Sequence, residues 1–177
     1  MTPELLPFPT PVVMALQAMP AGVALRAAVD SDVGFLRALY ADARAAELAG
    51  APLPADVRER FLDNQFALQH RHYITYFASA SFAIVERDGA PIGRLYADDS
   101  GSDLHLIDIS LAAAAQGQGI GTALLHALAR RARHEGRTLV LKVSRQNTAA
   151  ARLYERLGFT DEPVPGDSAY RAMRLVS

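Results

Sequence analysis

Seven consecutive residues, between an apolar run and an amphipathic stretch, have the composition of a loop that binds an anion. Glycines let a backbone turn tightly and approach a ligand closely, and the first amides of a following helix have no partner within that helix. Such amides point at an anion, so we expect a pyrophosphate here, with a threonine hydroxyl as a further donor. The seven residues are Gln116, Gly117, Gln118, Gly119, Ile120, Gly121 and Thr122.

Three other interpretations of this loop are a corner that binds nothing, a P-loop and a dinucleotide-binding loop. Three glycines at this spacing can also make a sharp strand-to-helix corner that binds nothing. No G-x-x-x-x-G-K-[ST] P-loop is present. A dinucleotide fingerprint would need a glycine where Thr122 stands and an acidic residue at the end of the next strand, where the sequence has Lys142 and Val143.

The elements that precede the loop are predicted from hydrophobic periodicity and turn residues. Residues 23–28 form an apolar run typical of a strand, and residues 30–32, Asp-Ser-Asp, are predicted to cap a helix that begins at Val33. A second helix is predicted after Pro54, with its end near His70.

Three strands are predicted next, and they form an antiparallel meander. Residues 81–87 and 90–98 are joined by Asp88-Gly89, a dipeptide that easily adopts the positive φ angles of a tight hairpin. A second turn leads into residues 103–111.

A different pattern follows the loop. Residues 121–134 are predicted as a helix, because apolar residues recur on one face and cations precede Gly136. Residues 138–143 are predicted as a strand, 147–157 as an amphipathic helix and 170–176 as a last strand. The order of strand, helix and strand predicts a right-handed parallel crossover.

Composition excludes several classes of protein. The 177 residues suit one domain, and 18 Lys+Arg against 19 Asp+Glu leave no field that would attract nucleic acid or an anionic membrane. The absence of cysteine excludes disulfides, thiolate zinc sites and a cysteine nucleophile. Residues 1–20 hold five prolines and no long apolar run, so we predict a proline-rich N-terminal arm before a domain of residues 21–177. We expect a cytoplasmic protein.

The loop and a second segment together resemble the GNAT superfamily of acyl-CoA N-acyltransferases. The superfamily's signature, [Q/R]-x-x-G-x-[G/A] at the start of the helix after the fourth strand, matches Gln116, Gly119 and Gly121. Residues 147–159, NTAAARLYERLGF, look like its fourth helix, where an asparagine, a tyrosine and a closing Gly-Phe recur at these distances. The resemblance covers residues 23–176.

The resemblance implies an α/β (α+β) fold with a mixed, mostly antiparallel sheet of six to seven strands, about four helices, and parallel strands four and five that splay apart. The pantetheine of acetyl-CoA would lie in that opening as a pseudo-strand, with its pyrophosphate at the loop. Gln116 stands where the superfamily often has arginine, which we expect to weaken phosphate binding because glutamine brings no charge. Beside the loop, the cofactor-binding residues so implied are Ile109, Ser110, Leu111, Asn147, Ala150 and Tyr154.

Acyl transfer from a thioester to an amine needs a neutral amine, a stabilised oxyanion and a proton donor for the leaving thiolate. An alkyl amine of pKa about 10 loses roughly 4 kcal/mol to protonation at pH 7, so a base helps. A backbone N–H near Ser110 or Leu111 would stabilise the oxyanion. The resemblance places Tyr154 beside the sulfur, and a phenol is protonated at neutral pH. Periodicity alone would make Tyr154 part of a buried helix stripe.

Three residues of the strand that leads to the site are candidates for the base: Asp103, His105 and Asp108. Asp103 and His105 share one face, and Asp108 lies on the other unless a bulge intervenes. A carboxylate in so apolar a run is costly to bury without partners. Asp108 is therefore the first choice for the base, with a structural hydrogen-bonding role near a strand bulge as the alternative.

The acceptor amine is less well defined by the sequence. Arg71 and Tyr73 would bear on specificity, together with His105, if their segment lines the acceptor pocket. His70 and His72 lack an evident third ligand, so we expect no metal. A small acidic cluster is suited either to a cationic amine or to a solvated loop, and it consists of Asp161, Glu162 and Asp167.

These observations predict an N-acetyltransferase that moves an acetyl group from acetyl-CoA to a primary amine of a small molecule or peptide. The alternatives are a non-catalytic acyl-CoA-binding module of the same fold and a nucleotide-binding oxidoreductase. We expect no nucleic-acid or membrane partner, and a homodimer is compatible with the resemblance.

Overall fold

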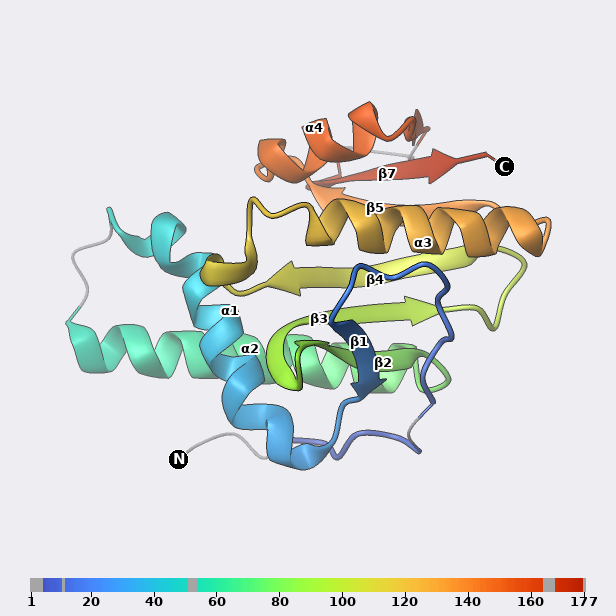
Figure 1. Cartoon of the computed structure of the whole chain (residues 1–177). Coiled ribbons are helices and arrows are strands. Elements are labelled where there is room, and N and C mark those ends of the chain that lie inside the picture. The colour runs from blue at the N-terminus through green and yellow to red at the C-terminus, as the bar shows by residue number, and fades with distance from the viewer. Residues whose placement is uncertain (1–4, 11, 51–53, 164–167, 177) are drawn as a thin grey trace.

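The computed structural model describes residues 5–10, 12–50, 54–163 and 168–176. Within these ranges the chain forms one seven-stranded sheet, in the order β1-β2-β3-β4-β5-β7-β6, with four α-helices packed around it (Figure 1). The strands are β1 (Val23–Ala27), β2 (Ser81–Arg87), β3 (Ala90–Asp98), β4 (Leu104–Leu111), β5 (Leu139–Ser144), β6 (Thr160–Glu162) and β7 (Tyr170–Leu175). The helices are α1 (Val33–Leu48), α2 (Ala55–Tyr76), α3 (Ile120–His134) and α4 (Thr148–Arg156).

The sheet is mixed and mostly antiparallel, which confirms the predicted fold class. Strands β1 to β4 pair antiparallel in sequence order, and β5 pairs antiparallel with β7, which pairs in the same way with β6. Asp88 and Gly89 turn the β2–β3 hairpin with φ angles of 50° and 81°. The crossover from β4 through α3 to β5 makes the one parallel pairing in the described sheet.

Strands β4 and β5 pair over a short stretch and then part. Their ladder consists of Leu104 opposite Leu139, His105 opposite Val140 and Leu106 opposite Leu141. Beyond it, β4 runs on against β3 and β5 runs on against β7. The facing edges of the two strands are therefore unpaired over the rest of their length, as the resemblance implied.

A bulge in β4 lies where the two strands part. Tyr96 of β3 pairs with Asp108, whereas the next residue, Ala97, pairs with Leu106. Ile107 is left without a partner, and the alternation of side chains shifts by one position. The bulge places Asp108 on the same face of the sheet as His105.

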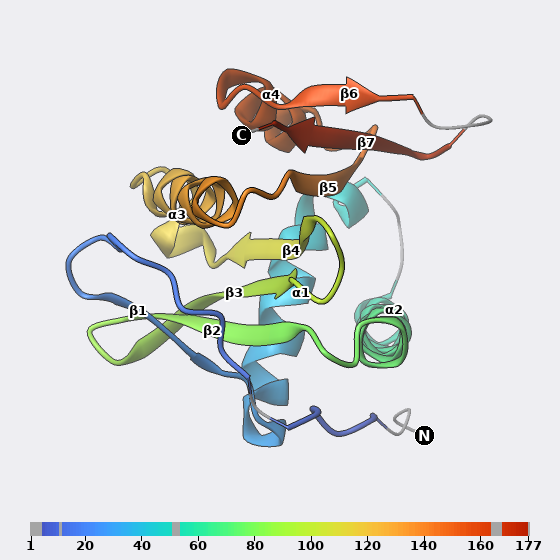
Figure 2. The same ribbon diagram turned by 90° about the vertical axis from the view of Figure 1, so that its right-hand side faces the viewer.

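Two apolar cores cover the two faces of the sheet. Helices α1 and α2 pack on one face around Leu36, Phe66 and Tyr96, and α3 and α4 pack on the other around Leu124 and Leu128. Figure 2 shows α2 and α3 on opposite sides of the sheet. No helix of the described residues is long and apolar enough to cross a membrane.

The described part of the proline-rich arm packs against both cores. Phe8 contacts the α1–α2 core, and Met14 is buried in the α3–α4 core. The backbone N–H of Met14 donates to Ser81 Oγ at 2.9 Å, and Arg130 donates to Gln17 O at 3.0 Å. The domain limit at residue 21 stays a prediction, but the preceding residues contribute to the packing.

Three local expectations differ from the structure. Helix α2 reaches Tyr76 instead of ending near His70, because its aromatic residues continue to pack on the sheet. The three-residue strand β6 was not predicted. Residues 30–32 form a short 3-10 turn, and Asp32 does not cap α1 but binds Arg26 through both oxygens at 2.7 Å.

Candidate active site

The glycine loop presents unpaired amides at the start of α3. Gly117 and Gly119 have φ angles of 70° and 78°, a conformation that a side chain would strain, and Gly119 is the N-cap. Ala123 is the first residue whose N–H has a partner, Gly119 O at 2.9 Å. The N–H groups of residues 117–122 donate no hydrogen bond within the described chain. They lie at the positive end of a 15-residue helix, where an anion is stabilised.

The two glutamines of the loop are used to hold its shape. Gln116 Nε2 donates to Leu111 O at 2.8 Å, which ties the loop to the end of β4. Gln118 Nε2 donates to Ala114 O, and its Oε1 accepts from Arg87 Nη1, both at 2.6 Å. A cation from the end of β2 therefore reaches the loop, although Gln116 itself brings none.

The free edge of β4 leads from the loop to the gap. Ile109 and Leu111 pack against the α3–α4 core, and Ser110 points to the opposite face, where it pairs across to Arg94. Gly93 lets β3 lie against this segment, because a Cβ there would sit 2.3 Å from Ser110 O. Ile109, Ser110 and Leu111 are thus fixed by β3 on one side and pair with no described strand on the side that faces β5, where Leu111 O accepts from Gln116.

A cleft of about 1040 Å³ lies where β4 and β5 part, and α1 and α2 supply its far wall. Leu111, Ala150, Arg71 and the loop residues 116–122 do not line it; Arg71 is exposed, and its neighbour His72 lines the cleft instead. The predicted site residues that line it are Tyr73, His105, Asp108, Ile109, Ser110, Asn147 and Tyr154.

Asp108 lies in a buried network that joins β4 to β3 and α2. Its Oδ2 accepts from Arg94 Nη2 and from the Tyr73 hydroxyl, each at 2.8 Å. The same Arg94 nitrogen donates to Gln69 Oε1 at 2.8 Å. The side chains of Arg94 and Asp108 are 6% and 14% exposed. Asp108 Oδ1 has no partner in the described residues and is not sealed from solvent, so it is free to accept from a ligand in the cleft.

The electrostatics of this network fix the protonation of its members. Burial raises the pKa of Tyr73 well above its usual range, and the charge of Asp108 raises it further. Burial alone would lower the pKa of Arg94, but the charge of Asp108, the neighbouring Tyr96 and Tyr73 and the hydrogen bond to Asp108 together outweigh it, so that pKa lies above its usual range. Tyr73 is therefore a hydrogen-bond donor and Arg94 a cation at every physiological pH.

Tyr154 both packs in the core and reaches the cleft. It is 8% exposed, and its ring lies 5.7 Å from that of Phe159. Burial raises the pKa of Tyr154 to about 12, and the charge of Asp108 adds to the effect. The hydroxyl makes no hydrogen bond with the described residues, and the residue lines the cleft. It is thus a protonated and uncommitted donor beside the gap.

The other predicted residues of α4 have identifiable structural contacts. Asn147 is the N-cap of α4, and its Oδ1 accepts from Ala150 N at 3.1 Å. Ala150 packs against the α3–α4 core. Asn147 also lines the cleft, and its Nδ2 makes no hydrogen bond with the described residues.

The two described members of the predicted acidic cluster, Asp161 and Glu162, do not line the cleft. Asp161 binds Arg171 at 2.8 and 2.9 Å, and Glu162 pairs with Arg174 at 3.1 Å. Both carboxylates lie on β6 with their charges paired, and Asp167 lies outside the described residues. Neither of the two described carboxylates is therefore placed to bind a cationic amine in the cleft.

The histidine segment is part of α2. His70 is buried, and its Nε2 donates to Leu6 O at 2.7 Å. Its ring contacts Phe8 and Phe66. Across the residues that the structure describes, no three potential metal ligands come together.

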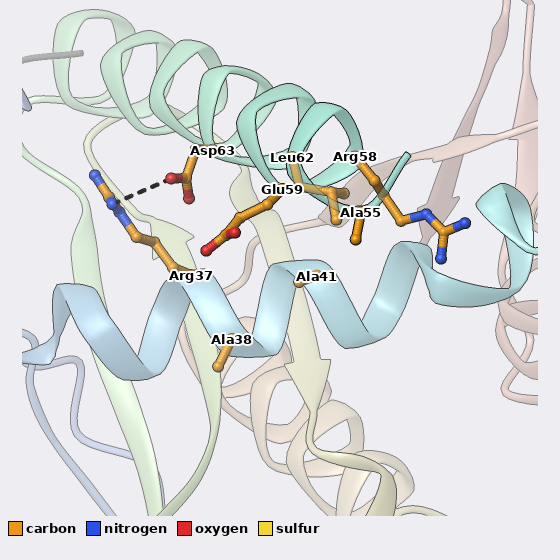
Figure 3. A pocket seen from close by; sticks show the side chains of 8 residues that line it. All are labelled: Arg37, Ala38, Ala41, Ala55, Arg58, Glu59, Leu62 and Asp63. Atoms are coloured by element: carbon orange, nitrogen blue, oxygen red, sulfur yellow. Dashed lines mark ion pairs between the residues drawn. The ribbon is translucent and has the colours of Figure 1, made fainter. Parts of the chain in front are cut away.

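A smaller hollow of about 450 Å³ lies between α1 and α2 (Figure 3). Arg37 and Arg58 line it together with Glu59 and Asp63, and Arg37 lies 3.6 Å from Asp63. Its charges are balanced, and it does not adjoin the gap between β4 and β5. The larger cleft is therefore the better candidate for acyl-transfer chemistry.

Arg94, Gln69 and Arg87 are candidate site residues that were not predicted from the sequence. Arg94 carried a signal, because it is a charged residue in an apolar strand, next in the meander to the strand that holds Asp108. Two opposite charges in neighbouring apolar strands predict a pair. Gln69 and Arg87 gave no such signal, since their contacts depend on tertiary structure.

A mixed sheet whose central parallel strands splay, with a glycine loop at one end of the gap and a buried tyrosine beside it, defines an acyl-CoA N-acyltransferase fold. The chain belongs to the acetyltransferase (GNAT) family, whose model matches residues 30–159.

Comparisons with individual proteins agree with this family. Mycothiol acetyltransferase of Streptomyces avermitilis is 32% identical over 80% of this chain and 44% of its own length. Mycothiol acetyltransferase of Streptomyces griseus is 35% identical over 59% of this chain and 34% of its own. The chain therefore spans less than half the length of these relatives. The crystal structure of PaiA N-acetyltransferase of Thermoplasma acidophilum in complex with coenzyme A is similar in fold, with a TM-score of 0.64, 20% identity, and 88% of this chain and 99% of that chain covered.

Proposed function

We propose that the protein is an N-acetyltransferase that transfers the acetyl group of acetyl-CoA to a primary amine of a small molecule or peptide, by direct attack in a ternary complex. The observation that carries the proposal is the gap between β4 and β5, with a free donor, Tyr154, and a free acceptor, Asp108 Oδ1, in the same cleft. Membership of the acetyltransferase family supports the reaction class.

The coenzyme is proposed to bind along the free edge of β4. Its pantetheine arm would pair with Ile109, Ser110 and Leu111, and its pyrophosphate would accept from the amides of residues 117–122. Arg87 would supply the positive charge that Gln116 lacks. Asn147, Ala150 and Tyr154 of α4 would form the opposite side of the coenzyme site.

Asp108 is proposed to act on the acceptor amine. Its Oδ1 would accept from the amine N–H and take up a proton as the C–N bond forms, directly or through water. Arg94 and Tyr73 hold the carboxylate in place through Oδ2, which leaves only Oδ1 for the substrate. An acceptor bound against the carboxylate would be oriented as well as deprotonated.

Tyr154 is proposed to protonate the departing sulfur. A thiol of pKa near 8.5 leaves as thiolate, and a donor in reach lowers the cost of expelling it. A backbone N–H on the free edge of β4 near Ser110 or Leu111 would stabilise the oxyanion. The Tyr154 hydroxyl and Asp108 Oδ1 make no competing hydrogen bond with the described residues.

The acceptor is proposed to be polar. The wall that α2 supplies carries Gln65, Gln69, His72 and Tyr73, so hydrogen-bonding groups outnumber apolar ones there. The two Streptomyces relatives are named for mycothiol, and a polar small molecule would be in keeping with them. His105 lies at the base of the cleft and would contact the acceptor or the acetyl group.

The decisive experiment measures thiol release from acetyl-CoA across a panel of amines. We expect release that depends on both substrates. In Tyr154→Phe, kcat should fall about 100-fold, as expected for the loss of a general acid, while the Kd for coenzyme A changes less than about twofold. Tyr76→Phe is the matched control, because Tyr76 is 72% exposed and does not line the cleft.

Two results would count against the proposal. Coenzyme A binding without turnover on any amine would indicate an acyl-CoA-binding module. Stabilisation by NAD(P)H and not by coenzyme A would indicate a different class of enzyme.

A further inference from the structure

Lysine is used once in this chain, at Lys142. The remaining 17 of the 18 basic residues are arginine, and every ion pair among the described residues uses an arginine. Arginine is always protonated, whereas lysine has a compact amine that can lose its proton and be acylated. The chain thus has arginine at every basic position except one, and that position has a lysine.

That position is the point where the sheet opens. Lys142 directly follows Leu141, the last residue of β5 that pairs with β4. Leu141 and Val143 are buried in the α3–α4 core, so the side chain of Lys142 points to the opposite face. It lines the same cleft as Asp108 and Tyr154.

Lys142 shares one face of the sheet with His105 and is not bonded to another group of the described chain. His105 lies opposite Val140, and Lys142 is the next residue of β5 on that face. Burial lowers the pKa of His105, and the charge of Lys142 lowers it further. Among the other charged residues that line the cleft, Asp108 is bound to Arg94 and Glu47 to Arg44, and Arg145 donates to Ser168 O at 2.7 Å. Lys142 forms no hydrogen bond or ion pair with any residue that the structure describes, and it is exposed to the cleft.

We propose that Lys142 is a self-acetylation site, acetylated by the acetyl-CoA bound in the adjacent gap. The inference rests on the proposed function, because it needs that coenzyme in that gap. The neutral Nζ attacks the thioester carbon, the C–N bond forms and the C–S bond breaks. The nitrogen loses a proton to the sulfur, which leaves as the thiol of coenzyme A. The product is an amide, and the cleft loses one positive charge.

The test uses the full chain and acetyl-CoA with no acceptor. Intact mass should rise by one acetyl group, and peptide mapping should place it on Lys142. Because the folded site holds the amine near the thioester, modification should be about tenfold or more faster than in the urea-unfolded chain at equal acetyl-CoA. Excess coenzyme A should slow the folded reaction and leave the unfolded one unchanged.

Two variants sharpen the result. Lys142→Arg should abolish the modification. Arg60→Lys adds a second lysine on the surface of α2, at a position whose side chain is 73% exposed, and it should be acetylated only at the rate of the unfolded chain. Equal rates at the two lysines, or an unmodified Lys142, would overturn the inference.

The same sample separates this inference from the proposed function. If coenzyme A binds and an amine acceptor is acetylated while Lys142 stays unmodified, only the self-acetylation is wrong. If coenzyme A does not bind, the proposed function itself fails.

Discussion

Arg94 and Asp108 bring opposite charges into the middle of two apolar strands. The cost of burying a carboxylate singles out Asp108 in the sequence, and the structure supplies the partner that this cost requires. The face of the sheet that Asp108 occupies could not be predicted from the sequence. That face depends on one unpaired residue, Ile107, in the ladder between β3 and β4. No sequence pattern within an apolar run reliably predicts a bulge. Asp108 was therefore predicted as a candidate, but its contacts with the neighbouring strand and helix were not.

Removal of one member of the pair should destabilise the fold. Arg94→Met leaves the Asp108 carboxylate buried without its counter-charge, and we expect the free energy of unfolding in urea to fall by about 3–5 kcal/mol. The double variant Arg94→Met with Asp108→Asn should recover much of that loss. Arg60→Met, which breaks an exposed pair with Asp56, should cost at most about 1 kcal/mol. The single variant Asp108→Asn completes the cycle. If the losses of unfolding free energy in Arg94→Met and Asp108→Asn simply add in the double variant, the two charges are not coupled.

At the scale of elements, local signals predicted most of the sheet. The Asp-Gly hairpin, the meander and the crossover through α3 follow from turn residues and periodicity near each element, and all are confirmed. Strand β6 was not predicted because its three residues are too few to show a strand pattern. They are held in place by pairing with β7, the next strand in the chain. The parting of β4 and β5 came from the family resemblance, since no local pattern shows where a ladder stops.

The loop at the start of α3 allows a test that separates binding from stability. Gly119 and Gly136 flank the two ends of α3, both have positive φ angles (78° and 66°), and neither has an atom within 4 Å of a built Cβ. Alanine at either position should cost roughly 1–2 kcal/mol of stability through backbone strain. Only Gly119→Ala should also weaken coenzyme A binding, measured by calorimetry. Equal Kd values in the two variants would remove the loop from the coenzyme site.

At the scale of the whole molecule, the N-terminal arm connects the two cores across the edge of the sheet. Met14 is 6% exposed, and Val12 beside it is 57% exposed. Met14→Ala should lower the free energy of unfolding by about 2–5 kcal/mol, as for other buried large-to-small changes. Val12→Ala should change it by less than about 0.5 kcal/mol. Equal, small effects would show that the arm packs without contributing to stability.

The arm also makes the stability depend on pH. Burial lowers the pKa of His70, so the folded state binds fewer protons than the unfolded state just below the ordinary histidine pKa of about 6.5. The contribution of His70 is fully present above that pH and is lost as the pH falls through its lowered folded pKa. His70→Gln keeps an amide donor for Leu6 O but cannot be protonated, so its unfolding free energy should fall less between pH 7 and pH 5. A residual fall is expected from His105, whose pKa burial also lowers. A slope equal to that of the parent chain would contradict the role of His70.

The short ladder between β4 and β5 has a mechanical consequence. Beyond its three residue pairs, the half of the molecule that holds β5, β7 and β6 is joined to the rest by side chains of the α3–α4 core. Backbone hydrogen bonds fix a register, whereas apolar packing is non-directional and tolerates small sliding movements. We therefore expect the spacing between these two halves to be adjustable at the open end of the sheet. A substrate that bonds to both halves would fix that spacing until the product leaves.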